Sequence, residues 1–131
     1  MEDRSRRQTL ESLGGGIGIF DPRQFQWFSS EEATAAYIYG DDADIRNVLV
    51  RNLEPGQENP AHTHVANAHV IYVLEGSGLC LRGDAPDEPM HAGQILVIPA
   101  RVVHGARNTG TTRLSYVTIV PWGIGGLEAT R

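Results

Sequence analysis

Short apolar stretches separated by turn-forming residues run through most of the sequence, and they limit the folds open to it. Each stretch has the length of a β-strand, and the seven lie at residues 25–28, 35–39, 45–53, 69–74, 78–81, 95–98 and 114–120. The separators, such as Glu54-Pro55-Gly56 and Asn108-Thr109-Gly110, have typical turn chemistry. Because helices do not alternate with these strands, we expect an all-β antiparallel sandwich or barrel. At residues 29–33 a Ser cap and acidic residues predict at most one helical turn.

The length of 131 residues suits one domain with short arms. The first dozen residues are polar and charged, without a clear period, and a glycine-rich run follows at residues 14–18. This run lacks the later Gly-Lys-Ser/Thr of a phosphate-binding loop and the βαβ setting of a dinucleotide site, so it predicts a flexible connector. We therefore expect a mobile N-terminal arm over residues 1–16 and a single β domain over residues 17–131.

Net charge and composition limit which binding partners and which cellular compartment we expect for this protein. The formal net charge is −5 and the basic residues are dispersed, so we expect no nucleic-acid partner. No apolar run approaches the ~18 residues that span a bilayer, which predicts no membrane insertion. Cys80 is the only cysteine and cannot form an internal disulfide, which favours a reducing compartment. These features predict a cytoplasmic protein, with Cys80 as a small buried side chain in a strand.

Four of the five histidines lie in two segments, as His62, His64 and His69 in one and His104 in the other. On an extended strand, residues two apart project to the same face, so the imidazoles of His62 and His64 can share one ion. His69 lies an odd number of residues from His64 and would face the other way on a straight strand. We therefore expect a bend near Ala66-Asn67 that places His69 on a neighbouring strand.

These histidines stand within two sequence signatures of the cupin family. The first is Gly, five residues, His-x-His, three or four residues, Glu, six residues, Gly; the chain matches it at Gly56, His62, His64 and Gly76, with His69 in the glutamate position. The second is Gly, five residues, Pro-x-Gly, two residues, His, three residues, Asn; the chain matches it at Gly93, Pro99, His104 and Asn108, with Arg101 in the second glycine position. The chain thus resembles a single-domain cupin, which implies a jelly-roll β-barrel.

The resemblance also implies one divalent metal ion per chain, bound by the motif residues His62, His64 and His104, with His69 as a fourth ligand. Four neutral imidazoles leave a site charge of +2, where a carboxylate would leave +1, so the ion is expected to be a stronger Lewis acid. Zinc or nickel is favoured, and iron, cobalt, manganese and copper remain open. Each histidine is expected to donate its second ring N–H to a carbonyl, a carboxylate or water.

A short cupin with four metal-binding histidines resembles the cupin polyketide cyclases of the resistomycin type. This implies aldol-type cyclisation of a small oxygen-rich organic substrate, with no organic cofactor. An iron-dependent cupin dioxygenase and a non-catalytic cupin that binds a small ligand are the alternatives. Besides a water on the metal ion, the candidate catalytic groups are Arg51 and Tyr116, but strand alternation without the register does not show which residues face inward.

Two further expectations concern the barrel wall and the assembly. Ile71 and Val73 alternate in phase with His69, so we expect an apolar wall beside the metal ion. A small antiparallel barrel has open sheet edges, and residues 17–28 have strand-like apolar character outside the motifs. We therefore expect a homodimer in which this segment covers a sheet edge of the partner.

Overall fold

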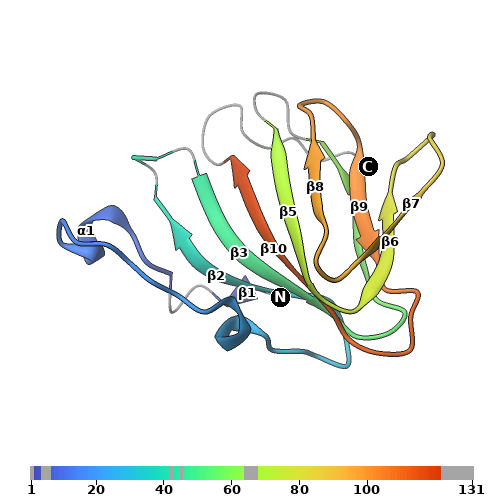
Figure 1. The fold of residues 1–131 in the computed structure, drawn as a ribbon, viewed down its shortest axis with the longest axis horizontal. Helices are drawn as coiled ribbons and strands as arrows, with labels where there is room; N and C mark the ends of the chain where they lie inside the picture. Colours follow the sequence, from blue (N-terminus) through green and yellow to red (C-terminus); the bar gives the residue numbers. More distant parts are fainter. Residues whose placement is uncertain (1, 4–6, 42, 45, 64–67, 122–131) are drawn as a thin grey trace.

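Two β-sheets face each other in the structure, a computed structural model that describes residues 2–3, 7–41, 43–44, 46–63 and 68–121 (Figure 1). The larger sheet has the order β1 (Glu2–Asp3), β2 (Thr34–Gly40), β3 (Arg46–Leu53), β10 (Leu114–Pro121), β5 (His69–Glu75) and β8 (Ile95–Ile98). The smaller sheet has the order β4 (Glu58–His62), β9 (His104–Arg107), β6 (Ser77–Leu81) and β7 (Glu88–His91). Apart from the parallel β1–β2 pair, all pairs are antiparallel, so the predicted fold class is confirmed.

Six of the seven predicted strands correspond to β2, β3, β5, β6, β8 and β10. The seventh, at residues 25–28, is wrong, because a 3-10 turn, η1 (Pro22–Phe25), ends there and side chains hold the residues that follow. The carbonyls of Phe25, Trp27 and Ser29 accept hydrogen bonds from the side chains of Asn52, Thr34 and Gln57 at 3.2, 2.6 and 2.7 Å. These side-chain bonds satisfy backbone carbonyls that would otherwise pair with a neighbouring strand.

Besides the two-residue β1, the pattern missed β4, β7 and β9, which are short and carry His, Pro, Glu or Arg instead of alternating apolar residues. Their backbones pair nonetheless, because neighbouring strands supply the hydrogen-bond partners. At residues 30–32 the chain bends without forming a helix, and the Ser29 hydroxyl accepts a hydrogen bond from the Glu31 N–H at 3.1 Å.

The N-terminal segment contains a short helix, α1 (Leu10–Leu13), that begins at a Thr9 cap and ends at Gly14 with a φ of 59°. Before it, the Gln8 backbone bonds to β2, donating to the Ile38 carbonyl and accepting from the Gly40 N–H. The division into a mobile arm over residues 1–16 and a domain over 17–131 stays a prediction. No helix among the described residues is long and apolar enough to cross a bilayer.

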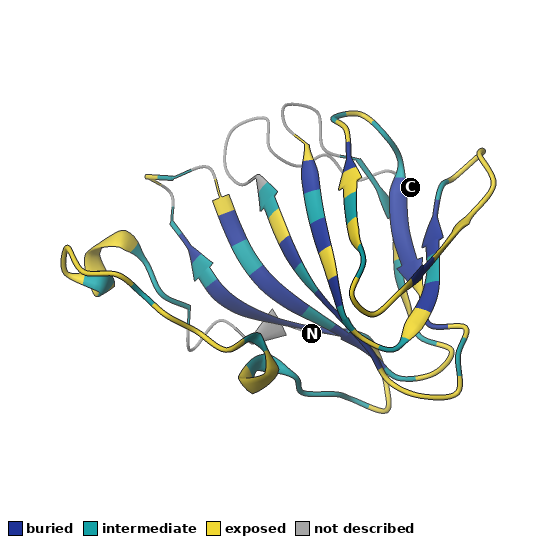
Figure 2. Ribbon diagram, in the orientation of Figure 1, coloured by how far each residue is buried: buried dark blue, intermediate teal, exposed yellow. Residues whose placement is uncertain are grey.

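The main core lies between the two sheets, and along β5 buried residues alternate with more exposed ones (Figure 2). Cys80 belongs to it and is 3% exposed, which confirms the buried thiol. Ile71 and Val73 are also buried there, in phase with His69, as predicted for the apolar wall.

Three motif glycines have a structural reason for their identity. Gly56, Gly76 and Gly93 adopt φ values of 85°, 83° and 91°, in the left-handed region that side chains disfavour. A Cβ on Gly76 would also clash with the Arg113 carbonyl oxygen. The glycine spacing of the two motifs therefore marks turns between strands.

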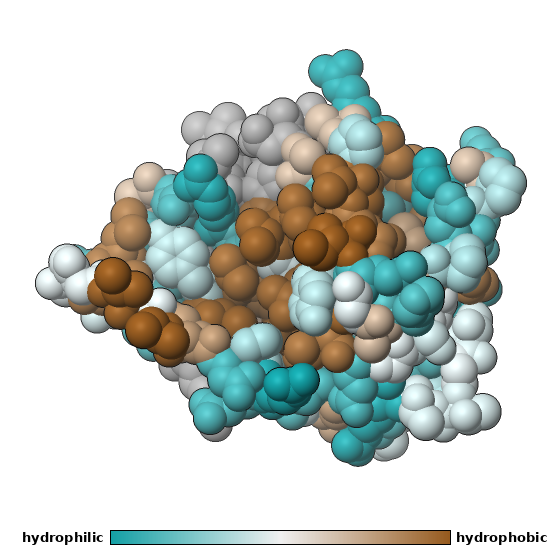
Figure 3. All heavy atoms as spheres, in the orientation of Figure 1, coloured by the Kyte–Doolittle hydropathy of each residue, from teal (hydrophilic) through white to brown (hydrophobic). Residues whose placement is uncertain are grey.

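Exposed apolar side chains form a strip on the outer face of the larger sheet, over β10, β5 and β8 (Figure 3). We define the strip as Tyr72, Ile95, Val97 and Ile119, which are 41–66% exposed. In the N-terminal segment, Ile17 and Ile19 are 91% and 89% exposed. The homodimer, in which residues 17–28 cover a sheet edge of the partner, stays a prediction. The strip is a second surface that suits a contact with another copy of the chain.

If the strip is the dimer contact, Ile119→Asp should weaken association at least about tenfold, because the new carboxylate would be desolvated without a partner. Ala85→Asp, at an exposed site in the β6–β7 loop, serves as the matched control and should remain a dimer. Light scattering at micromolar concentration measures both. A monomeric wild-type protein under these conditions would contradict the prediction.

Candidate metal centre

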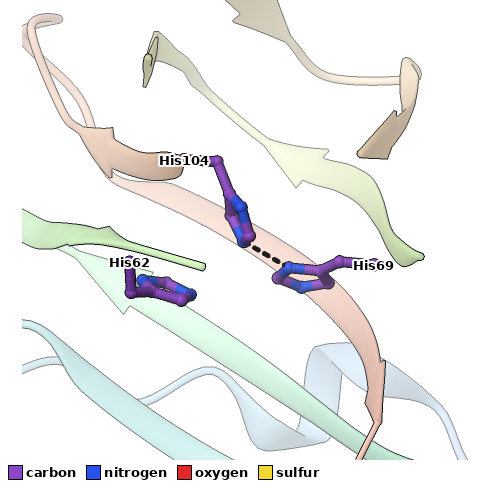
Figure 4. A group of neighbouring side chains, drawn as sticks. All are labelled: His62, His69 and His104. Carbon is purple, nitrogen blue, oxygen red and sulfur yellow. Dashed lines mark hydrogen bonds between the residues drawn. The ribbon is translucent and has the colours of Figure 1, made fainter. Parts of the chain in front are cut away.

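Three of the four predicted ligands come together where the two sheets meet (Figure 4). His62 ends β4 and His104 begins β9, and the two are paired across the smaller sheet. His69 begins β5 in the larger sheet. One ring nitrogen from each histidine lies within 4.8 Å of the other two. His64 and the expected bend at Ala66-Asn67 lie outside the described residues.

The expectation for His69 needs correction in one respect. It lies on the facing sheet and not on a strand beside β4, because β5 pairs with β10 and β8 while β4 pairs with β9. Residue spacing indicated a change of face but contained no information about which sheet β5 joins. The cluster therefore bridges the two layers of the sandwich.

An irregularity in β4 brings His62 to the interior. Between Asn59 and His62 the register with β9 shifts, so these residues, three apart, face the same way. Asn59 shows which way this is, because its Nδ2 donates a hydrogen bond of 3.2 Å to the hydroxyl of Tyr116 on the opposite sheet. An uninterrupted strand would have turned one of the two side chains outward.

The three rings are close and unequally buried. The ring centroids of His62 and His104 are 4.4 Å apart, and those of His69 and His104 are 4.6 Å apart. His69 and His104 are 5% and 2% exposed, whereas His62 is half-buried. Nδ1 of His69 lies 2.6 Å from Nε2 of His104, shown as the dashed line in Figure 4.

Backbone carbonyls set the tautomers of two rings. Nδ1 of His62 lies 2.9 Å from the Pro60 carbonyl oxygen, and Nδ1 of His104 lies 3.0 Å from that of Val102. A carbonyl oxygen only accepts, so each Nδ1 carries the proton and each Nε2 presents a lone pair to the cluster. The expected N–H donation is thus found at both residues. By the same logic His69 Nδ1–H donates to His104 Nε2, and a bound cation would displace this proton.

Arg51 and Tyr116, the candidate catalytic residues, share a row on the inner face of the larger sheet, where Tyr116 pairs with Arg51 on one side and Val73 on the other. Tyr116 is 1% exposed and Arg51 is half-buried. Burial raises the pKa of the Tyr116 hydroxyl, while the Arg51 charge and the hydrogen bond from Asn59 lower it by less. The phenol therefore keeps its proton at neutral pH.

Asn59 is a residue of the site that the sequence analysis missed. It pairs with Ala106, two residues along β9 from His104, which is about 7 Å at 3.3 Å per residue. The Asn59–Tyr116 hydrogen bond therefore joins the sheets one step inward from the histidine cluster. Its position three residues before His62 gave no signal, because only the irregularity in β4 turns it inward.

The motif residue Asn108 explains how the end of β9 is fixed. It is 1% exposed, and its Nδ2 donates to the carbonyls of Leu53 and Thr112, both at 2.9 Å. Its Oδ1 accepts from the Gly110 N–H at 3.0 Å. One buried side chain thus connects β9 to the end of β3 and to the turn before β10.

Comparison with known proteins identifies the family. The family model for the cupin domain matches residues 49–120, which contain all four predicted ligands and most of both sheets. The chain belongs to the cupin family. A search of curated proteins found no match. The three imidazoles suit the borderline divalent ions that bind nitrogen ligands, so the described residues fit the metal that the family implies.

Solved cupin structures agree with this fold. A conserved protein with a double-stranded β-helix domain from Klebsiella pneumoniae is 26% identical, with 86% of this chain and 96% of that chain covered and a TM-score of 0.77. The polyketide cyclase RemF from Streptomyces resistomycificus is 24% identical, with coverage of 77% and 72% and a TM-score of 0.66. A predicted oxalate decarboxylase from Thermotoga maritima is 23% identical, with coverage of 70% and 81% and a TM-score of 0.63. The predicted jelly-roll cupin is confirmed.

Arg101, in the turn before His104, takes a left-handed backbone conformation that glycine adopts more readily. Its φ is 70°, and among the described residues it is the one non-glycine residue with a positive φ. The Val102 N–H donates to the Pro99 carbonyl at 3.3 Å across the same turn. Arg101 therefore holds this turn at the cost of backbone strain, about 1–2 kcal/mol for an L-residue.

Arg101→Gly should relieve this strain and stabilise the fold by about 0.5–1 kcal/mol, after the greater unfolded-state entropy of glycine is subtracted. For a domain of this size the melting temperature should rise by about 2–4 °C. Arg101→Ala removes the same guanidinium but keeps Cβ and the strain, so it should give no such rise. Equal melting temperatures for the two variants would show that the φ of Arg101 carries no cost.

Proposed function

We propose that the protein is a metal-dependent enzyme that cyclises a small, oxygen-rich organic substrate without oxidation. The observation that carries this proposal is the convergence of His62, His69 and His104 from two sheets onto one partly accessible point. His64, which the family motif places among the ligands, completes the proposed set. The similarity to RemF, a polyketide cyclase, supports the choice of reaction class.

The donor set favours Lewis-acid chemistry over oxygen chemistry. A bound divalent ion would supply positive charge that polarises a carbonyl oxygen of the substrate and stabilises negative charge forming there. His69 contributes a neutral imidazole where the family motif has a carboxylate, so the chain's own ligands cancel none of that charge. Zinc and nickel are the proposed ions.

Tyr116, Asn59 and Arg51 are proposed to orient the substrate beside the cluster. Tyr116 accepts a hydrogen bond from Asn59, so the phenolic proton is free to be donated. Its raised pKa keeps that proton in place at neutral pH. The half-buried Arg51 adds a fixed positive charge in the same row. A proton donor and a cation next to an apolar wall suit a substrate that develops negative charge on oxygen during ring closure.

The His69→Glu variant tests the charge argument. It should retain the metal ion, because a carboxylate is the usual ligand at this position of the motif. Its added negative charge should slow the non-oxidative ring closure of a 1,5-diketone, with heptane-2,6-dione as the probe, by ~10²–10³, the typical cost of losing one oxyanion stabiliser. Metal analysis and the rate of cyclohexenone formation are the two measurements.

Other outcomes identify the competing functions. Undiminished ring closure with the ion in place would contradict the charge argument, and a wild-type protein no faster than free zinc would contradict the reaction class. Oxygen uptake by the iron-loaded His69→Glu variant with pentane-2,4-dione would instead indicate a dioxygenase. A change in metal affinity or melting temperature alone would indicate a structural metal site.

A further inference from the structure

A cavity of about 530 Å³ opens between β7 and β8, the strands at the free ends of the two sheets. It is lined by residues of β6, β7 and β8 and by the segment that leads into β9. None of the three clustered histidines lines it. Of the motif residues named above, Pro99 alone lines it, and the proposed metal chemistry does not use this space.

The wall of the cavity combines apolar side chains with the polar groups of Arg82, Glu88 and Gln94. Leu96 and Ile98 come from β8 and Val102 from the turn before β9, and the buried thiol of Cys80 adds to this surface. Burial raises the pKa of that thiol, so it is uncharged at neutral pH. A volume of this size, with apolar side chains and a few polar groups in its wall, is typical of small-molecule sites.

Arg82 places a positive charge in the wall of the cavity. Its Nε is buried and has no hydrogen-bond partner among the described residues. Nη1 lies 3.8 Å from Oε2 of Glu88, which is too long for a hydrogen bond. The Glu88 side chain is 59% exposed, so the attraction between the two is largely screened by water.

The Arg82 side chain is 32% exposed, but its buried Nε–H is left unsatisfied, which is costly. A carboxylate satisfies it best, because its two oxygens match the guanidinium fork. Glu88 does not occupy that position in the structure, because its carboxylate lies 3.8 Å from Nη1 and its side chain is largely exposed. Apolar side chains beside one under-satisfied guanidinium therefore match a ligand with a hydrophobic body and one carboxylate.

We propose that this cavity binds a small amphipathic carboxylate, with the carboxylate on Arg82 and the hydrophobic body against Leu96, Ile98 and Val102. The site is separate from the metal cluster but borders it. Ile98 pairs with His69, and the Val102 carbonyl accepts from His104 Nδ1. The proposal does not depend on the cyclisation chemistry and goes beyond it.

Calorimetric titration of the metal-loaded protein with 2-naphthoate, and with the neutral 2-naphthalenemethanol, tests the site. We expect the acid to bind more tightly than the alcohol. Arg82→Gln should weaken binding of the acid at least about tenfold, the usual size of a charge-assisted hydrogen bond, and leave the alcohol nearly unchanged. Glu88→Gln, the matched control on the other side of the pair, should tighten binding of the acid a few-fold because a competing anion is removed.

A second measurement locates the ligand without any substitution. On addition of 2-naphthoate to the wild-type protein, the amide NMR signals of Leu96, Ile98 and Val102 should shift, and the affinity should be the same after treatment with EDTA. Equal affinities for acid and alcohol, or an unchanged affinity in Arg82→Gln, would overturn the proposal. Loss of binding with EDTA would place the acid on the metal ion and would also overturn it.

Discussion

The function proposed for this cupin depends on the face-to-face packing of its two sheets. His62 and His104 belong to one sheet and His69 to the other, so no single sheet assembles the cluster. The buried core between the sheets holds the layers at a fixed separation, and the Asn59–Tyr116 hydrogen bond joins them one step inward from the histidines. If the packing between the sheets were lost, the three histidine ligands would move apart even though each of them was still present.

Burial of neighbouring imidazoles is itself an energetic constraint. His69 and His104 are almost fully buried with facing ring nitrogens within hydrogen-bond distance, and buried polar atoms are costly unless they are hydrogen-bonded or bind a metal ion. Backbone carbonyls at Pro60 and Val102 fix the outer protons of His62 and His104, so each Nε2 turns its lone pair to the cluster, and that of His104 accepts from His69 Nδ1. Such an arrangement is stabilised most by a cation between the rings, so the same contacts that orient the donors also favour metal binding.

Much of the fold and of the site could be predicted from residue spacing. Turn glycines such as Gly56 and Gly93 mark where the chain must reverse, and the histidine spacing indicated a shared ion. Spacing did not predict which sheet carries His69, because that depends on strand pairing between distant segments. It also missed Asn59, which faces inward only because of a local irregularity in β4. At Arg101 the backbone takes a left-handed conformation, which the residue type alone would not have indicated.

The central claim is that the histidine cluster binds one divalent ion, and the metal content of the protein tests this claim most directly. Protein purified without an affinity tag should contain about one equivalent per chain, and His104→Ala should lose it because a buried donor between the other two rings is removed. His91→Ala is the matched control, since His91 lies exposed at the end of β7, and it should retain the ion. Full occupancy in the His104→Ala protein would contradict the account.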